Sequence, residues 1–496
     1  MQQPFELTRR VFEIIPAFIS WSIILVFILF AFLLPMPCAF FIIIFDIFWV
    51  IRGIYLTSLL IMAHRRLQKE KNRLWFQECK EEFNGRWEGI YQAVILPVYK
   101  EDLGVLIPSL ESLHKANYPK DRMIVVVAFE ERAENSYMHA QALEARYKNE
   151  FYAFIPTFHP DGLPGETRTK GANATWAAQR LKEFLQSKGI AFEGVLVSCF
   201  DADTCVEKEY FGCLLKQFLI SDKPLQRSYQ PIPVYNNNIW KAPSLARIIE
   251  ITSSYCQLID SMRLEKFVTF SSHSMSFKTL VDIDYWPVDR VSDDSLIYWK
   301  AYLYYNGDYK VIPLYITVSM DVACDKNLFK TFTMQYRQKR RWAWGVEVFP
   351  YVMMRFRRDS IRIPFREKAR RVFQILDSHV TWAVWAVIIT VVSPISVFMS
   401  VNMFKESVIA FNLPRITSLL FQVTNVTILL WVILSFSLLP PRPKDIPWFA
   451  RLRIITQWLF IPFVVFLVGS TPALDAQTRL AFGRYMGFAY TEKKHE

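Results

Sequence analysis

Five long apolar stretches constrain what this chain can fold into more than any other feature of its sequence. A helix needs about 20 apolar residues to cross a bilayer. The stretches that meet or approach this length are residues 14–34, 38–63, 380–404, 416–440 and 454–474. The first is too long for the apolar core of a cleaved signal peptide, and a second follows it directly. The sequence therefore predicts an integral membrane protein with helical spans.

Basic residues at the ends of these stretches predict the orientation. Lys and Arg beside a span favour the cytoplasmic side, and the residues in question are Arg9, Arg10, Arg65, Arg66, Lys69, Lys71, Arg73, Arg366, Lys368, Arg370 and Arg371. Residues 75 to 370 are therefore expected in the cytoplasm. The net charge is +12 in a chain with 52% apolar residues, so the expected partner of that charge is a lipid bilayer and no nucleic acid.

The basic residues at the C-terminal end conflict with the number of spans that the apolar stretches predict. Three further full crossings would place its basic residues outside, against the rule; these are Arg479, Arg484, Lys493 and Lys494. Either the last stretch is re-entrant or interfacial, which we prefer, or the rule fails here. The predicted parts are an N-terminal hairpin (1–74), a cytoplasmic domain (75–325), interfacial amphipathic helices (326–372), a C-terminal membrane region (373–474) and a cytoplasmic tail (475–496).

The cytoplasmic part reads as alternating strands and helices. Short apolar runs predict buried strands over residues 90–97, 123–129 and 194–200, and helical patterns follow the first two runs, over 103–115 and 133–149. Such alternation is typical of an α/β fold whose mainly parallel sheet is covered by helices on both faces. In these sheets, ligands bind beyond the carboxyl ends of the strands.

Acidic residues follow each predicted strand at that edge. Glu101 comes after the first, Glu130 and Glu131 after the second, and Asp201 with Asp203 after the third. Two carboxylates one residue apart suit a hard divalent cation such as Mg²⁺ or Mn²⁺, which also binds substrate phosphates. The alternative for this Asp pair is a capped turn. The seven cysteines show no metal-ligand spacing, which argues against zinc and against disulfides.

Three further clusters carry charge or potential chemistry. Asp293 and Asp294 precede a predicted helix over 296–306, where acidic residues are favoured by the helix dipole but could also supply a general base. Lys170 could contact a phosphate. The segment 338–342 combines Gln, Lys, two Arg and Trp. It would suit a basic helix on anionic lipid, although that leaves Gln338 and Trp342 unexplained.

In this order, these residues resemble the motifs of membrane-embedded family 2 glycosyltransferases, such as the cellulose, chitin and hyaluronan synthases. Pro97, Tyr99 and Glu101 stand where that family has PxYNE, and Lys170 opens a segment that resembles its KxxN element. Asp201-Ala202-Asp203 matches DxD. The resemblance covers roughly residues 90 to 345 and the tail.

The remaining motifs lie further along the chain. Ser292-Asp293-Asp294 resembles the TED motif, and Gln338 to Trp342 matches QxxRW in full. Phe488, Thr491 and Lys493 resemble the FxVTxK gating loop. The family often has a small-residue segment where Ser271 to Ser274 lie, and His273 within it is expected to be structural.

The resemblance implies a GT-A fold and a nucleotide-sugar donor, most often a UDP-sugar. Asp201 and Asp203 would hold Mg²⁺ or Mn²⁺, with Asp203 as the expected direct ligand, and Asp294 would be the general base. The acceptor and diphosphate site would be lined by Asp293, Gln338, Arg341 and Trp342. The donor site would include Pro97, Tyr99, Glu101, Glu130 and Lys170. Where the family usually has an Asp pair that contacts the nucleoside, this chain has Glu130 and Glu131.

Three functions remain open at this point. The leading one is an inverting synthase that extends a polysaccharide and couples extension to its translocation. The second is a single-addition transferase that glycosylates a membrane lipid such as polyprenyl phosphate, since four or five spans are few for a pore. The third is a non-catalytic scaffold or transporter subunit, against which the acidic residues and Arg341 speak.

Overall fold

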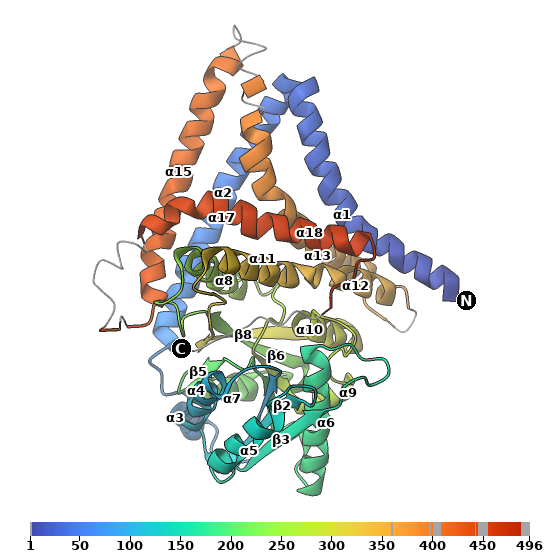
Figure 1. Ribbon diagram of the computed structural model, residues 1–496, viewed down its shortest axis with the longest axis vertical. Helices are drawn as coiled ribbons and strands as arrows, with labels where there is room; N and C mark the ends of the chain where they lie inside the picture. Colours follow the sequence, from blue (N-terminus) through green and yellow to red (C-terminus); the bar gives the residue numbers. More distant parts are fainter. Residues whose placement is uncertain are drawn as a thin grey trace.

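The computed structural model describes residues 2–358, 361–395, 398–399, 408–441, 443–444 and 455–487. A mixed sheet with its covering helices forms one end of the molecule, and long apolar helices extend from the other (Figure 1). A layer of shorter helices lies between these two parts (Figure 1).

Within the described part of the chain, the sheet has eight strands in the order β3-β2-β1-β4-β7-β6-β8-β5. Neighbours among β3, β2, β1 and β4 pair in parallel, whereas β7 is antiparallel to both β4 and β6. Their bounds are β1 Tyr91–Val98, β2 Met123–Glu130, β3 Ala153–His159, β4 Val195–Cys199, β5 Cys205–Val206, β6 Arg227–Val234, β7 His273–Ser276 and β8 Lys310–Ser319. The predicted strands thus correspond to β1, β2 and β4.

Helices cover both faces of the sheet, as the sequence predicts. Successive side chains of a strand point to opposite faces, so Val94 and Leu96 of β1 join one core while Ala93 and Ile95 join the other. The helices on the first face are α3 Trp75–Glu82, α4 Leu103–His114, α5 Ser136–Tyr147 and α7 Tyr210–Ile220. Those on the second are α6 Lys170–Ser187, α9 Phe277–Asp282, α10 Asp293–Tyr304 and α12 Val348–Phe356.

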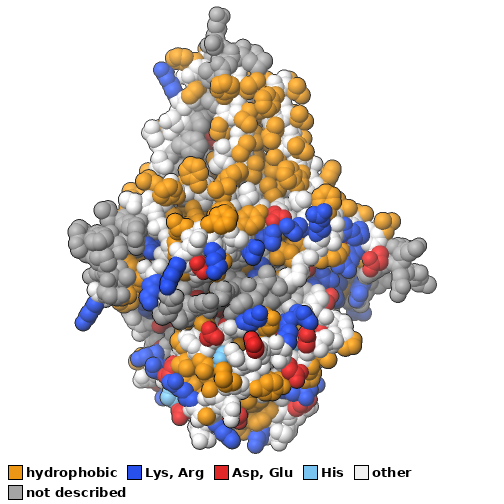
Figure 2. Space-filling view, viewed as in Figure 1, with side chains coloured by type: hydrophobic (Ala, Val, Ile, Leu, Met, Phe, Trp, Pro, Cys, Tyr) orange, Lys and Arg blue, Asp and Glu red, His pale blue; other side chains and the backbone are white. Residues whose placement is uncertain are grey.

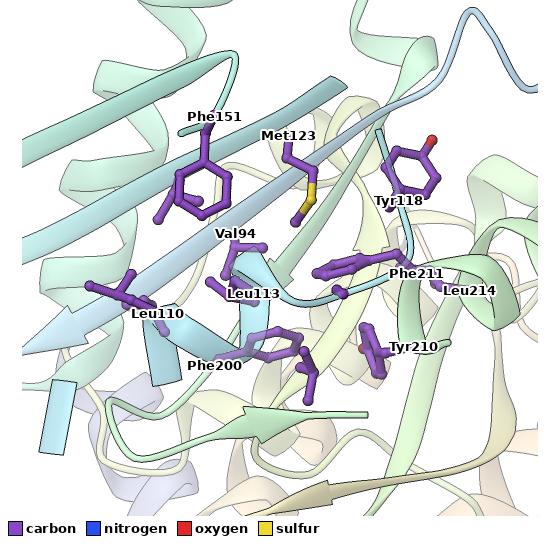
Figure 3. Packing of buried hydrophobic residues seen from close by; sticks show 14 of the residues in the cluster. Val94, Leu110, Leu113, Tyr118, Met123, Phe151, Phe200, Tyr210, Phe211 and Leu214 are labelled. Carbon is purple, nitrogen blue, oxygen red and sulfur yellow. The ribbon is translucent and has the colours of Figure 1, made fainter. Parts of the chain in front are cut away.

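Figure 3 shows the first of these cores. Val94 and Met123 from the strands point toward Leu113 of α4 and Phe211 of α7. All eight residues of β2 are buried, which explains why this strand reads as a continuous apolar run rather than an alternating one. Short 3₁₀ turns complete the connections: η1 Lys120–Arg122, η2 Phe192–Gly194 and η3 Pro224–Gln226.

Among the residues that the structure describes, five helices are long and apolar enough to cross a membrane. They overlap the five stretches found in the sequence: Glu6–Leu33, Pro35–Glu70, Phe365–Ile395, Pro414–Leu438 and Gln457–Ala481. Apolar side chains cover this end of the molecule, and Lys and Arg gather in a belt beneath it (Figure 2). The elements that contain these five segments are α1 Gln2–Leu33, α2 Pro35–Glu70, α13 Phe365–Val387 with η5 Ile388–Val392, α15 Val408–Leu438, and the series η6 Gln457–Phe460, α17 Ile461–Val464, η7 Val465–Ser470 and α18 Thr471–Ala481.

The last of these segments lies differently from the others. α17 and α18 run across the base of the long helices (Figure 1), where α18 packs against α1 and α11. Between this segment and the sheet lie α8 Ser244–Ser261, α11 Leu328–Ala343 and η4 Trp344–Glu347. The position of this segment at the membrane interface stays a prediction. The domain boundaries also stay predictions, and helix α13 continues through the predicted boundary at residue 372.

Two of the long helices pack directly against the layer beneath them. Leu60, Ala63 and Leu67 of α2 share an apolar cluster with Ile232 and Val234 of β6. Within the same cluster, the Tyr255 hydroxyl of α8 donates to the carbonyl of Trp431 in α15 at 2.7 Å. The sheet is therefore joined to the long helices by a continuous apolar contact.

Candidate active site

The acidic residues predicted at one edge of the sheet do follow the carboxyl ends of parallel strands. Glu101 follows β1, Glu130 ends β2, and Asp201 and Asp203 follow β4. Pro97 lies in β1 opposite Ala128 of β2. The parallel register of these strands brings their ends to a common edge.

The Lys170 ammonium group connects two of the predicted motifs. Its Nζ lies 2.6 Å from Asp201 Oδ1 and 3.0 Å from Asp294 Oδ1. Asp201 also accepts a hydrogen bond from the Ser271 hydroxyl at 2.6 Å. The first residue of α6, the turn after β4 and the first turn of α10 therefore converge on one point.

The charges at this point reinforce one another. Burial opposes the charge on Lys170, but the carboxylates of Asp201 and Asp294 outweigh that effect and hold the pKa of Lys170 well above its usual value. The neighbouring Asp293 is buried, and burial together with the Asp294 carboxylate raises the pKa of Asp293. Lys170 thus stays charged at neutral pH, whereas Asp293 resists ionisation.

Two contacts fix the position of the α10 N-terminus. Gly171 of α6 approaches it so closely that a Cβ at this position would lie 2.5 Å from the Pro287 carbonyl oxygen and 2.9 Å from Asp293 Cβ. On the other side, the backbone N–H of Ser292 donates to Glu347 Oε1 at 3.1 Å, and its hydroxyl donates to the same oxygen. Glu347 follows the QxxRW segment in η4, so this segment and the α10 N-terminus are joined through a buried carboxylate.

Asp203 is held differently from Asp201. Its side chain is buried, and Oδ2 accepts a hydrogen bond from the backbone N–H of Asp321 at 2.8 Å. Asn237 donates from its amide both to the Asp203 carbonyl and to Asp321 Oδ1, each at 3.0 Å. Asp201 is the more exposed of the two, with 26% of its side chain accessible.

The carboxylates at this site suit a divalent ion that takes some of its ligands from the protein and the others from a substrate. Among the residues that the structure describes, no group of three or more His, Cys, Asp or Glu side chains is arranged to hold a metal. Asp201 and Asp203 offer hard carboxylate oxygens, and Mg²⁺ is commonly bound through one or two carboxylates plus substrate phosphates. The residues present therefore fit a metal bound together with a diphosphate.

Glu130 takes part in a buried ion-pair network that the sequence does not reveal. Its Oε2 lies 3.1 Å from Arg132 Nε and 3.5 Å from His159 Nδ1, and His159 Nε2 lies 2.9 Å from Glu166 Oε2. The Arg132 guanidinium lies over the Tyr99 ring, 4.6 Å from its centroid. Glu130 is therefore flanked by two basic side chains.

Backbone contacts hold the predicted donor-site segments together. The Tyr99 N–H donates to Glu101 Oε2 at 2.7 Å, which closes the turn after β1. Asn173, one turn into α6, donates from its amide to the carbonyl of Ala128 at 2.7 Å and to that of Val98 at 3.4 Å. Asn173 thus ties the start of α6, and with it Lys170, to the ends of two strands.

The QxxRW residues lie on α11 beside the carboxylates. The Gln338 side chain is buried, and within the described residues its Oε1 has no hydrogen-bond partner. The Arg341 charge is close enough to Asp293 to oppose, in part, the rise in its pKa. Trp342 meets the Phe270 ring edge to face, with centroids 5.4 Å apart.

One basic residue inside this motif has a structural position. Lys339 Nζ is buried 3.1 Å from Glu250 Oε2 and 2.8 Å from the Ser253 hydroxyl, both on α8. The same ammonium group lies 3.5 Å from the centroid of the Trp342 ring. Lys339 therefore packs against the Trp342 ring. Because its charge is buried in an ion pair, Lys339 does not fit the alternative of a basic helix on anionic lipid.

Phe488, Thr491 and Lys493, the gating-loop-like residues, lie outside the described part of the chain. The described residues just before them contact α1. The Tyr485 hydroxyl donates to Glu13 Oε2 at 2.9 Å, and Arg10 donates to the Ala481 carbonyl at 2.7 Å.

His273 is buried with Nδ1 3.1 Å from the Phe270 carbonyl, as expected of a structural histidine.

The structure thus brings Lys170, Asp201 and Asp294 into contact, and places Arg341 within electrostatic reach of the adjoining Asp293. Sequence reasoning missed Arg132 and His159, which contact Glu130. It also missed Glu166, which contacts His159, and Glu347, which contacts Ser292. The register of β2 and β3 pairs Glu130 with His159. A predicted strand over residues 153–159 could have revealed His159, because this strand ends beside Glu130.

Comparisons with known proteins find similarity at the level of structure alone. No protein-family model matches the chain, and no curated protein matches it. Solved structures that resemble it include a mannosyltransferase, PcManGT from Pyrobaculum calidifontis, in complex with GDP-Man and Mn²⁺ (14% identity, TM-score 0.42, covering 77% of this chain and 98% of that one).

Two others are TarS 1–349 from S. aureus in complex with UDP-GlcNAc (16% identity, TM-score 0.37, 74% of this chain and 89% of that one) and GalNAc-T7 with UDP, GalNAc and Mn²⁺ (11% identity, TM-score 0.34, 58% of each chain). At these TM-scores the likeness does not establish a function.

Proposed function

We propose that this chain is an inverting glycosyltransferase with a GT-A domain on the cytoplasmic face of a membrane. It takes a sugar from a nucleotide-sugar donor, in the first place a UDP-sugar, and extends a polysaccharide acceptor. The observation that carries the proposal is the contact of one buried ammonium group, Lys170, with both Asp201 and Asp294. This contact joins the predicted metal-binding turn to the predicted base.

The chemistry requires a base on the acceptor side and positive charge on the leaving-group side. Asp294 accepts the proton of the acceptor hydroxyl as its oxygen bonds to the anomeric carbon. The bond from that carbon to the diphosphate oxygen breaks, and the electron pair leaves with the nucleoside diphosphate. Attack from the face opposite the leaving group inverts the anomeric configuration.

Positive groups stabilise the charge that develops on the diphosphate. Lys170 supplies one such charge, and Arg341 supplies another that can bind phosphate oxygens in a bidentate manner. Asp201 and Asp203 would hold Mg²⁺ or Mn²⁺, which as a Lewis acid polarises the phosphate oxygens of the donor. Burial, together with the Asp294 carboxylate, raises the pKa of Asp293, so we assign the role of base to Asp294 and not to Asp293.

The acceptor end is formed by the QxxRW residues. The aromatic ring of Trp342 suits stacking on a sugar. The Gln338 Oε1 is buried and can accept a hydrogen bond from a hydroxyl. Glu130, with Arg132 and His159 beside it, would bind the nucleoside part of the donor.

A non-catalytic scaffold does not require Lys170 and Asp294 to be in contact, so this alternative is not favoured.

A donor-hydrolysis and product assay tests the proposal. Purified full chain in lipid is incubated with a panel of UDP- and GDP-sugars plus Mn²⁺, nucleotide release is measured, and products are sized on a gel. We expect release with one donor and a high-mass ladder. A single small lipid product would instead support the single-addition transferase.

Asp294→Asn and Asp289→Asn form the matched pair for this assay. Asp289 is an exposed acid in the loop before α10. Asp294→Asn should lower kcat by about 10²- to 10⁴-fold, the range for general-base catalysis, while Asp289→Asn keeps wild-type turnover. Full activity in Asp294→Asn would show that the catalytic assignment is wrong.

A further inference from the structure

The proposed base, Asp294, lies in the first turn of a helix whose start is held by another element. Ser292 is the N-cap of α10, and its hydroxyl donates to Glu347, whereas an N-cap hydroxyl ordinarily accepts from the N–H groups of its own helix. Ser295 stands where a capping box would have the Glu or Gln that reaches back to the N-cap N–H. Glu347 accepts from that N–H instead, at 3.1 Å. The position of Asp294 therefore depends on a tertiary contact.

The surroundings of Glu347 hold its carboxylate in one place. Its side chain is buried, and Oε1 accepts both hydrogen bonds from Ser292. Arg290 Nη1 lies 3.8 Å from Oε2. Burial raises the pKa of Glu347, although the Ser292 hydrogen bonds and the Arg290 charge oppose this effect. A buried polar group that loses its partner costs free energy, so Ser292 and Glu347 are expected to stay together.

The element that carries Glu347 lies between the long helices and α10. Glu347 is the last residue of η4, which directly follows α11 and its QxxRW segment. Trp344 of η4 shares a buried apolar cluster with Ala383 of α13. Val348, the next residue after Glu347, shares another with Leu296 of α10. Glu347 thus adds a polar contact where η4 and α10 already meet through apolar side chains.

We propose that Glu347 is a positioning residue for glycosyl transfer, which holds Asp294 at the distance from Arg341 and Trp342 that the reaction requires. It acts through Ser292 and the first turn of α10, and it transfers no proton itself. A misplacement of about 1 Å, caused far from the reacting atoms, can lower a rate about 10²-fold. This inference rests on the proposed function and adds a residue to it.

The kinetics of nucleotide release test this role in the full chain in lipid, with the donor that wild type hydrolyses. Glu347→Ala should lower kcat about 10- to 100-fold. The donor KM should stay within about twofold of wild type, because Lys170 still faces Asp201. Glu347→Gln should restore most of the rate, since its amide oxygen can accept both bonds from Ser292. A Glu347→Ala variant with wild-type kcat would overturn the inference.

Glu209→Ala provides the matched control. Glu209 Oε2 accepts from the backbone N–H of Phe76 at 3.0 Å, so this carboxylate also joins two elements, α7 and α3, on the face of the sheet away from α10. Glu209→Ala should lower the Tm but keep wild-type kcat. A similar fall in kcat in Glu209→Ala and Glu347→Ala would assign the effect to lost stability and overturn the inference.

A double variant separates action through Asp294 from a general effect on the site. In Asp294→Asn the base is already absent, so adding Glu347→Ala should lower kcat by less than about twofold, because residues that act as a unit are not additive. A further loss as large as the one that Glu347→Ala causes in wild type would show that Glu347 acts elsewhere.

Amide hydrogen exchange gives a readout that needs no turnover. The Ser292 N–H donates to Glu347, so its exchange should be faster in Glu347→Ala and close to wild type in Glu347→Gln and Glu209→Ala. Unchanged exchange in Glu347→Ala would show that this contact does not hold α10, and would overturn the inference while leaving the proposed function intact. No nucleotide release by wild type with any donor would overturn the proposed function and, with it, the positioning role.

Discussion

Lys170 shows how much of this site depends on a single side chain. It is the first residue of α6, yet its ammonium group lies between carboxylates from the turn after β4 and from α10. Without that charge, the two carboxylates would face each other in a partly buried space. In the proposed function, the same charge would bind the diphosphate of the donor.

We expect Lys170→Met to raise the donor KM by about ten- to a hundredfold. A hydrogen bond to a charged group contributes about 1.5–3 kcal/mol, and about 1.4 kcal/mol corresponds to a factor of ten. Steady-state kinetics of nucleotide release measure the effect. Lys182→Met, on the same helix but further along it, should behave as wild type. An unchanged donor KM in Lys170→Met would contradict this role.

His159 should make stability depend on pH. Burial lowers the pKa of His159, but the carboxylates of Glu130 and Glu166 outweigh it, so its folded pKa lies above the usual value. A raised pKa stabilises the fold fully below the unfolded value of about 6.5, and this contribution is lost as pH rises through the folded pKa.

Thermal unfolding between about pH 5.5 and 8.5 measures this dependence. The Tm advantage of wild type over His159→Gln should be largest at the acidic end and shrink as pH rises. Glu166→Gln removes one of the two partners and should reduce the pH dependence without abolishing it. A Tm difference between wild type and His159→Gln that does not vary with pH would show that the ion pairs are not coupled to folding.

At the scale of elements, the close approach of α6 and α10 determines where Lys170 and Asp294 meet. Gly171→Ala would place a Cβ against the Pro287 carbonyl, a backbone atom that cannot move alone. Overpacking of this kind costs about 1–3 kcal/mol, so we expect a loss of that size in the free energy of unfolding, together with a higher donor KM.

Gly89→Ala provides the matched control, because no atom lies within 4 Å of a Cβ built at that position. Chemical denaturation and the kinetics of donor hydrolysis are compared for both variants. Equal stability of the two would mean that α6 and α10 are not held at this distance in solution.

The elements also show what the sequence could and could not predict. Residues 123–129 predicted β2 because Ile and Val run through it without interruption. In contrast, β6 contains Pro231 and Pro233, and β7 is only four residues long and mostly polar. Neither has the apolar pattern that marks a strand, so tertiary packing decides their structure.

The candidate site follows the same division. Asp201, Asp203 and Asp294 could be selected because carboxylates at strand and helix ends suit metal and proton chemistry. Their contact through Lys170 joins residues 124 positions apart and depends on how α6 packs, which no local pattern encodes. His159, one partner of Glu130, remained hidden because β3 contains Pro156 and was not predicted.

At the scale of the whole molecule, the proposed activity requires a divalent ion. Incubation with EDTA should abolish nucleotide release, and Mg²⁺ or Mn²⁺ should restore it, because Asp201 and Asp203 cannot bind the diphosphate without a bridging cation. Asp203→Asn should require higher metal concentrations for half activity than wild type. Full turnover in a chelator would count against the role of this Asp pair.

The apolar contact of α2 and α15 with the layer around β6 sets an order for biosynthesis. Helix α2 is made before β6, but α15 ends only at Leu438, long after the last strand has left the ribosome. Until then, Tyr255 has no Trp431 carbonyl to bind, and one side of that layer stays uncovered. The domain built on the sheet therefore keeps part of its apolar surface uncovered until both helices are in place. A shortened chain without these helices would present that surface to water and should aggregate.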